Sequence, residues 1–97
     1  MTQYKRGRQA EYWCRGQLLE DGYHTIIRAA GSKGMFDLAA IGDHAIKLVQ
    51  VKRVTGSKVP SFAAELAVMR DVAVPECCHK ELWIWLDEKK AWVILPA

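Results

Sequence analysis

The sequence lacks any apolar run close to the ~20 residues that a membrane-spanning helix needs, so we expect no membrane partner. It has only three cysteines, and an odd number that includes the adjacent pair Cys77-Cys78 makes a poor disulfide framework. His79 follows this pair, but no second ligand pair stands at a spacing that suits zinc. We therefore expect a reducing, cytoplasmic setting and no structural zinc site.

The sequence also lacks the features of repeat proteins, disordered chains and secreted precursors. The chain has no internal repeat, no linker and no low-complexity segment, and its first eight residues carry charges without the apolar run of a secretory signal. Hydrophobic residues make up 51% of the sequence and charged residues 26%, which is typical of a folded globular protein. A length of 97 residues predicts one domain over residues 1–97.

Charge of both signs is present, but it is unevenly distributed. The net charge is a mild +3. Basic residues gather at the N-terminus and around the centre of the chain, at Lys5, Arg6, Arg8, Arg15, Arg28, Lys33, Lys52, Arg53 and Lys58. A basic half favours a polyanion partner, with nucleic acid ahead of a membrane surface, and the alternative is an ordinary solvated surface.

The pattern of apolar residues and turn residues predicts an α+β fold. We expect a helix over 6–21 that Gly22 ends, then strands over 23–28, 35–41 and 45–53. Ser61 is the expected N-cap of a second helix that runs to Val72, and strands over 80–86 and 91–95 follow. The order α-β-β-β-α-β-β predicts a central mixed sheet flanked by helices.

Three polar residues lie in the predicted central strands, where polar side chains cost free energy unless they pair or bind a metal: Asp37, Gln50 and Lys52. If Asp43 and His44 form a two-residue hairpin loop, Asp37 lies opposite Gln50. If the loop is one residue earlier, Asp37 lies diagonal to Gln50. Because side chains alternate along a strand, either loop predicts that the three share one face of the sheet.

Glu11 is a fourth candidate, because its helical position places it close to the apolar face that carries Cys14 and Leu18. The alternative is a glutamate at the rim of this face, paired with Arg15 four residues later. Two carboxylates and an amide oxygen suit a hard cation such as Mg²⁺ or Mn²⁺. A neighbouring lysine can orient a water and offset the charge of a phosphorane-like transition state. Metal-assisted phosphodiester hydrolysis would use all four groups.

The same residues carry a resemblance to a known superfamily. The matching pieces occur in order along the chain, at Lys5-Arg6-Gly7, Glu11, Gly22-Tyr23, 28–32, 36–40 and Gln50-Val51-Lys52, with a weaker match at 81–85. In this order and spacing the chain resembles the PD-(D/E)XK nucleases, and within them the archaeal-type Holliday junction resolvases, including the forms carried by phages. That resemblance implies the α-β-β-β-α-β core already expected from the sequence pattern.

The resemblance also implies roles for individual residues. Glu11, Asp37 and Gln50 would be catalytic metal ligands for Mg²⁺ (or Mn²⁺), with the carbonyl of Val51 as a further ligand, and Lys52 would be the catalytic lysine. Ser32 would lie near the scissile phosphate. Members of this family are homodimers that cut four-way junctions. The residues that would bind DNA are Lys5, Arg6, Arg8, Arg15, Arg28, Lys33, Arg53 and Lys58.

Two positions depart from the superfamily pattern. Phe36 stands where a proline is nominal, and Gln50 stands where a glutamate is usual. An amide keeps an oxygen ligand but removes one negative charge, so metal affinity should fall. The alternatives are therefore another nuclease of the same core (flap, nicking or restriction-type) or a catalytically silent DNA-binding module. Glu65 could add a carboxylate, although a solvated helix position is favoured for it.

The predicted strand over 80–86 carries large apolar side chains on both faces. Leu82, Ile84 and Leu86 point one way, while Trp83 and Trp85 point the other way. Both faces are therefore expected to be covered. Either helices of this chain cover them, or the two tryptophans help to build a dimer interface.

Overall fold

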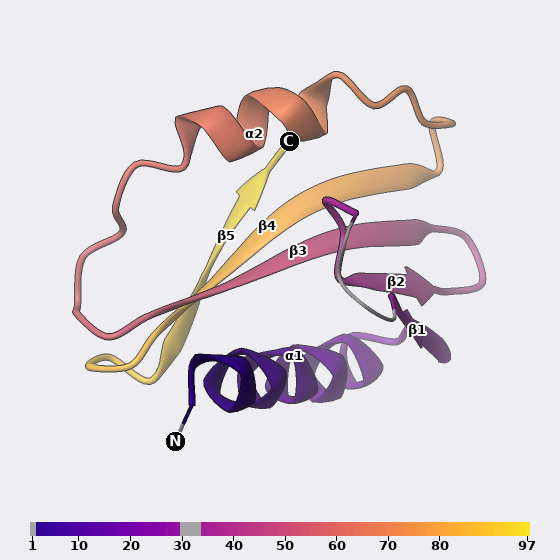
Figure 1. The fold of residues 1–97 in the computed structure, drawn as a ribbon. Helices are drawn as coiled ribbons and strands as arrows, with labels where there is room; N and C mark the ends of the chain where they lie inside the picture. Colours follow the sequence, from indigo (N-terminus) through magenta and orange to yellow (C-terminus); the bar gives the residue numbers. More distant parts are fainter. Residues whose placement is uncertain (1, 30–33) are drawn as a thin grey trace.

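The computed structural model describes residues 2–29 and 34–97. Ser32 and Lys33 lie outside these ranges. The elements follow the predicted order (Figure 1): α1 (Gln3–Glu20), β1 (Thr25–Arg28), β2 (Leu38–Ile41), β3 (Ile46–Val54), α2 (Ala63–Arg70), β4 (Cys78–Leu86) and β5 (Ala91–Pro96). No helix in the described ranges combines the length and hydropathy that a membrane crossing requires.

The strands form one mixed sheet in the sequential order β1-β2-β3-β4-β5. β3 and β4 are parallel and are joined through α2, whereas the other neighbours are antiparallel. Helix α1 lies against one face of the sheet and α2 lies on the other (Figure 1). The predicted α+β architecture, a mixed sheet flanked by helices, is confirmed.

The hairpin between β2 and β3 has the first of the two expected registers. Ile41 pairs with Ile46, Leu38 pairs with Val49, and the Gly42 N–H donates to the Ala45 carbonyl at 2.9 Å. The loop is therefore Asp43-His44. This register places the position of Asp37 opposite Gln50, although Asp37 itself precedes β2.

Helix α1 begins three residues earlier than the sequence pattern predicts. Thr2 is its N-cap, and the Thr2 hydroxyl accepts a hydrogen bond from the Lys5 N–H at 3.2 Å, which satisfies one of the free N–H groups of the first turn. Gly22 ends the helix as expected, with a φ of +103° that glycine adopts without steric cost. The earlier start brings Tyr4 into the helix.

Helix α2 is shorter than predicted at both ends, because Ser61 is not its N-cap. Phe62 occupies that position without a side-chain cap, and the Ser61 hydroxyl only approaches the Ala63 N–H at 3.5 Å. The other end of the helix is bound by Lys80 from β4. Its ammonium group donates to three main-chain carbonyls, those of Met69 at 2.7 Å, Arg70 at 3.0 Å and Val72 at 2.7 Å. A cation at this end also complements the helix dipole.

Each face of the sheet has its own core. The core under α1 contains Cys14, Leu18, Leu38, Ala40, Val49 and Trp83, and the core under α2 contains Met69, Leu82, Ile84 and Leu86. Trp83 is fully buried, and the Trp85 ring lies 4.9 Å from the ring of Trp13 on α1. Helices of this chain therefore cover both faces of β4. The interpretation of Trp83 as a dimer contact is wrong, because α1 already covers it.

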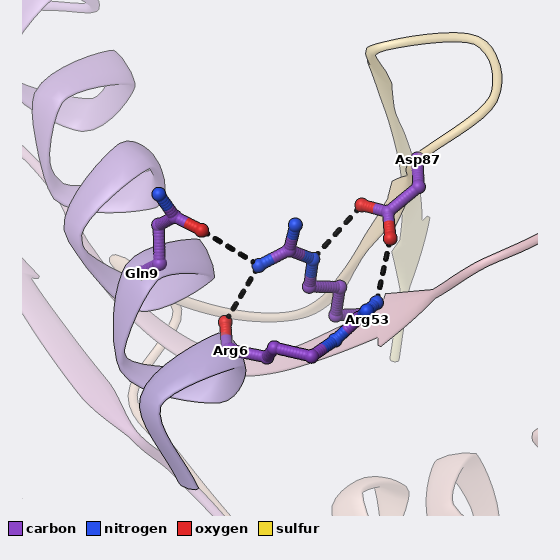
Figure 2. A network of polar contacts seen from close by, with 4 residues as sticks. All are labelled: Arg6, Gln9, Arg53 and Asp87. Atoms are coloured by element: carbon purple, nitrogen blue, oxygen red, sulfur yellow. Dashed lines mark hydrogen bonds and ion pairs between the residues drawn. The ribbon is translucent and has the colours of Figure 1, made fainter. Parts of the chain in front are cut away.

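A polar network joins the start of α1 to the far end of the sheet (Figure 2). The guanidinium of Arg53 on β3 donates to the Asp87 carboxylate at 2.8 Å, to the Gln9 side chain at 2.9 Å and to the Arg6 carbonyl at 3.1 Å. Arg6 donates to the other oxygen of Asp87 at 2.6 Å. One carboxylate in the turn after β4 thus holds two arginines that we had expected to bind DNA.

Partial burial raises the pKa of Asp87, but the hydrogen bond and charge of Arg53, together with Arg6, outweigh it and hold the pKa below its ordinary value of 3.8. We expect Asp87→Asn to lower the free energy of unfolding by about 1 to 3 kcal/mol at pH 7, because hydrogen bonds to charged groups are worth that much. Because the pKa of Asp87 is lower in the folded protein than in the unfolded chain, its charge stabilises the fold. This stabilisation is fully present above the pKa of the unfolded chain and is lost as the pH falls through the pKa of the folded protein. The two proteins should therefore converge near pH 2.

Urea titrations at both pH values measure this difference. Glu88→Gln, at the exposed neighbouring position, is the matched control and should leave stability unchanged. Equal stability of Asp87→Asn and the unmutated protein at pH 7 would show that the network contributes nothing.

Candidate functional site

The site lies where β2 begins, next to the part of β3 that extends beyond β2. Of the described residues, only Leu38 to Ile41 pair with β3 on this side, so residues 50–54 of β3 have a strand beside them only on the other side, where β4 lies. The Asp37 carboxylate takes the place of a strand on the side of β2. Its Oδ2 accepts a hydrogen bond from the Val51 N–H at 2.7 Å, and the Asp37 N–H donates to the Val49 carbonyl at 2.8 Å. The local fold therefore fixes a carboxylate against the backbone of β3.

The pKa of Asp37 is raised. Burial raises it most, while the hydrogen bond from Val51 and the positive charges of Lys52 and Arg28 lower it by less. The positive charges of Lys52 and Arg28 therefore both act on the Asp37 carboxylate. The neighbouring positive charges thus do not fully offset the cost of burying the charged Asp37 carboxylate, and a bound cation would stabilise this charge further.

Glu11 reaches the same place from α1. Glu11, Asp37 and Val51 line one hollow of about 210 Å³ between α1 and the sheet. The Glu11 side chain is only 12% exposed, and its Oε2 lies 3.3 Å from the Nε of Arg28 and 3.9 Å from the Nε of Arg8. The alternative that paired Glu11 with Arg15 is wrong. The two predicted carboxylates do meet, and arginines hold one of them.

Lys52 lines a larger hollow next to the first. This second hollow, of about 620 Å³, lies between the start of α1 and the free end of β3, and Val51 borders both. Arg6 and Arg53 also line it. The two hollows therefore meet at Val51, with Asp37 in the first and Lys52 in the second.

The position of Gln50 differs from that of the other candidates. Its side chain lines a separate hollow of about 250 Å³ on the α2 face, with Met35, Glu65 and Val68. Asp37 instead lines the hollow on the α1 side, because it precedes β2 and the alternation rule for strands does not govern its side chain. The structure brings Glu11, Asp37 and Val51 to one hollow, while Lys52 lines the neighbouring hollow and Gln50 lines the hollow on the α2 face.

Gln50 nevertheless has an unusual oxygen. Its Oε1 is buried and has no hydrogen-bond partner among the described residues. A buried acceptor without a partner costs about 1 to 3 kcal/mol, so it would gain from a ligand that accepts its lone pair. Glu65 borders the same hollow and is the nearest additional carboxylate that the sequence offered.

The donor chemistry of these residues fits a hard cation. Glu11, Asp37 and the Val51 carbonyl supply oxygen donors, and Gln50 has an unpartnered one, which suits Mg²⁺ or Mn²⁺. Within residues 2–29 and 34–97, no group of three or more His, Cys, Asp or Glu could hold a metal ion. A cation here would therefore depend on two carboxylates and on neutral oxygens.

The other predicted residues are placed around these hollows. Arg8, Arg15 and Arg28 line a third hollow between α1 and the first two strands, while Lys5 and Lys58 are exposed. The sequence analysis missed two tyrosines, Tyr4 and Tyr12, which line the hollows beside Glu11. Their four-residue spacing from Arg8 was the signal that could have identified them.

Comparison with known proteins gives a structural match. No family model matches the sequence, and no curated protein matches it. The structure is similar to that of Hjc, a Holliday junction resolvase from the archaeal hyperthermophile Archaeoglobus fulgidus, with a TM-score of 0.73 and 21% sequence identity. The match covers 94% of this chain and 72% of that chain. This chain has the fold of an archaeal Holliday junction resolvase. The resemblance inferred from the sequence is confirmed at the level of the fold.

The raised pKa of Asp37 yields a prediction about stability. We expect Asp37→Asn to raise the free energy of unfolding at pH 7 in EDTA, by about 1 kcal/mol as at other functional sites, because the amide oxygen can accept from Val51 without a buried charge. The pKa of Asp37 is higher in the folded protein than its ordinary value of 3.8. Its negative charge therefore lowers the free energy of unfolding fully above the folded-state pKa, and has no such effect below pH 3.8. The advantage of the variant should disappear near pH 3.

Chemical denaturation at the two pH values measures this effect. Asp43→Asn, whose side chain is 83% exposed in the hairpin loop, is the control and should change little. A large loss of stability in Asp37→Asn would mean that the charge itself supports the fold.

Proposed function

We propose that this protein is a metal-dependent, structure-selective DNA endonuclease of the Holliday junction resolvase type. The observation that carries the proposal is the convergence of Glu11 and Asp37 on Val51, with Lys52 next to them, in a chain with the fold of a resolvase. Carboxylates and a lysine in this arrangement suit phosphodiester hydrolysis.

Each residue has a distinct part in this reaction. Glu11, Asp37 and the Val51 carbonyl would hold Mg²⁺ or Mn²⁺. Gln50 would join this set if its unpartnered oxygen turned from the hollow on the α2 face toward Val51. A bound cation of this kind lowers the pKa of water and polarises a phosphoryl oxygen. Lys52 orients the attacking water and offsets the negative charge that develops on the phosphate. Ser32, near the scissile phosphate in the resembling family, stays a prediction.

The ion pairs at Glu11 supply a route to DNA binding. Arg28 and Arg8 now lie at 3.3 Å and 3.9 Å from this carboxylate. If Glu11 held a cation, both guanidinium groups would become available for phosphate oxygens. The exposed Lys5 and Lys58 extend the positive surface. By contrast, Arg53 and Arg6 are already held by Asp87, so their share in DNA binding depends on that network opening.

The remaining predictions concern assembly and setting. A homodimer would present two such sites to a four-way junction. An intracellular location and a phage origin also stay predictions. Incubation with labelled four-way junction, flap and duplex DNA tests the substrate class. We expect cleavage of the four-way junction that requires Mg²⁺. Preference for the flap or the duplex would favour another nuclease of the same core.

One observation favours a second function, that of a silent DNA-binding module. The described residues offer no group of three acidic or other strong metal ligands, and Gln50 stands where a third carboxylate would complete one. Binding of branched DNA without cleavage in either Mg²⁺ or Mn²⁺ would support this alternative.

We expect Lys52→Ala to abolish cleavage and to leave junction affinity almost unchanged, because a catalytic lysine acts mainly in the transition state. Cleavage and binding are measured separately, the latter in EDTA. Lys89→Ala removes an exposed lysine from the turn before β5 and should have wild-type activity. Wild-type cleavage by Lys52→Ala would refute the assignment.

We expect Gln50→Glu to keep or increase metal-dependent cleavage and to lower the Mg²⁺ concentration at half-maximal rate, because the change restores a negative charge. Gln50→Met, of similar size but without the oxygen donor, should raise that concentration. A large loss of activity in Gln50→Glu would show that position 50 does not contact the cation.

A further inference from the structure

Helix α1 carries a stripe of tyrosines and arginines that the catalytic proposal does not use. Tyr4, Arg8, Tyr12 and Arg15 follow one another at spacings of four, four and three residues. At about 100° per residue they fall within about 80° of the helix circumference, so they share one side of α1. Tyr4 is 68% exposed and Tyr12 is 69% exposed, more than any other large hydrophobic side chain in the described ranges.

The stripe borders an excess of positive charge. Arg8, Arg15 and Arg28 line a hollow of about 290 Å³ beside Tyr12, and Ile26 and Leu38 are also part of its wall. Among the described residues, Glu11 is the only acidic one that lines this hollow, so one carboxylate lies with three guanidinium groups. The arrangement leaves two positive charges for an anionic ligand. An apolar wall with an arginine rim also suits a ligand that has both flat apolar and anionic parts.

One tyrosine of the stripe is held in place before any ligand binds. The Nη1 of Arg8 donates to the Tyr4 hydroxyl at 3.1 Å, and the guanidinium carbon lies 5.9 Å from the centre of the Tyr4 ring. This contact orients an exposed ring beside the hollow that contains Glu11 and Asp37. An oriented aromatic ring loses less conformational entropy when a flat ligand stacks on it.

We propose that this stripe binds unpaired nucleotides of the DNA strand that leads to the site, with bases stacked on Tyr4 and Tyr12 and phosphates bound by the arginines between them. Eight residues separate the two tyrosines, a helical rise of about 12 Å. That distance matches a span of a few nucleotides in an extended strand. Aromatic side chains beside a positive groove are the usual means of binding single-stranded nucleic acid.

The inference deepens the proposed nuclease function. It rests on that function because the DNA strand bound by the stripe is the one that leads to the proposed cleavage site. It narrows the substrate class to four-way junctions with unpaired nucleotides next to the cleaved bond. A perfectly paired arm offers its base edges and phosphates to α1 but no free base face for the tyrosines. The protein should therefore bind four-way junctions with unpaired bases at the branch point more tightly than fully paired four-way junctions.

Binding assays in EDTA test the inference without any cleavage. The probes are a fluorescein-labelled oligothymidylate of about 12 nucleotides, which cannot form pairs, and a duplex of the same length. We expect the double variant Tyr4→Ala/Tyr12→Ala to lose about tenfold or more in affinity for oligothymidylate and less than about twofold for the duplex. The double variant Tyr4→Phe/Tyr12→Phe keeps both rings and should stay within about twofold of the unmutated protein for both probes.

Val68→Ala is the matched control, since it truncates an apolar side chain of α2 that is 52% exposed on the other face of the sheet. Thermal melts establish that each variant is folded. Equal losses for both probes, unchanged affinity of the alanine variant, or a phenylalanine variant as weak as the alanine variant would each overturn the stacking role.

Cleavage assays with Mg²⁺ separate this inference from the proposed function. Ring-dependent binding of oligothymidylate by a protein that cuts no DNA would refute the nuclease and support the stripe. A protein that cuts junctions while its alanine variant binds oligothymidylate normally would refute the stripe and leave the nuclease intact.

Discussion

The hydrogen bond from the Val51 N–H to the Asp37 carboxylate is the contact on which the site depends. It forms because β2 pairs only with residues 46–49 of β3, so that the Val51 N–H would otherwise have no partner on this side of the strand. A carboxylate that completes a sheet in this way is fixed in position by the fold itself. Lys52 follows Val51 directly in β3, so the residue next to this bond in the chain is the lysine. The position of the Asp37 carboxylate thus follows from the difference in length between two neighbouring strands.

Shared carboxylates organise the charge around that contact. Asp87 holds Arg6 and Arg53, and Glu11 faces Arg8 and Arg28, so in both places one anion serves two guanidinium groups. Such clusters remain positive overall and attract phosphates while each arginine is still oriented. They differ in what they connect. The Asp87 cluster ties α1 to the turn after β4 (Figure 2), whereas the Glu11 cluster borders the hollow that Asp37 also lines.

Local patterns in the sequence were enough to predict the element order, the mixed sheet and the Asp43-His44 hairpin loop, because apolar periodicity and turn residues act over a few positions. They also predicted the register that places the position of Asp37 opposite Gln50. They did not predict that Asp37 precedes β2, because strand ends depend on how far the neighbouring strand extends. Nor did they predict the partners of Arg53 and Glu11, since these ion pairs join residues that are distant in the sequence. For Gln50, the strand register was predicted from the sequence. The hollow that its side chain lines was not, because that hollow depends on where α2 packs.

The three bonds from the Lys80 ammonium to the end of α2 have a consequence for local unfolding. α2 has eight residues and no side-chain cap at its start, so its own helical propensity cannot keep it ordered. Its order therefore depends on one lysine of β4 and on the packing of Met69 against the sheet. The amide protons of α2 should exchange with solvent through a local opening that leaves the five-stranded sheet intact. In that open state the face of β3 that carries Gln50 becomes accessible, so access to this face is governed by the fluctuation of one short helix.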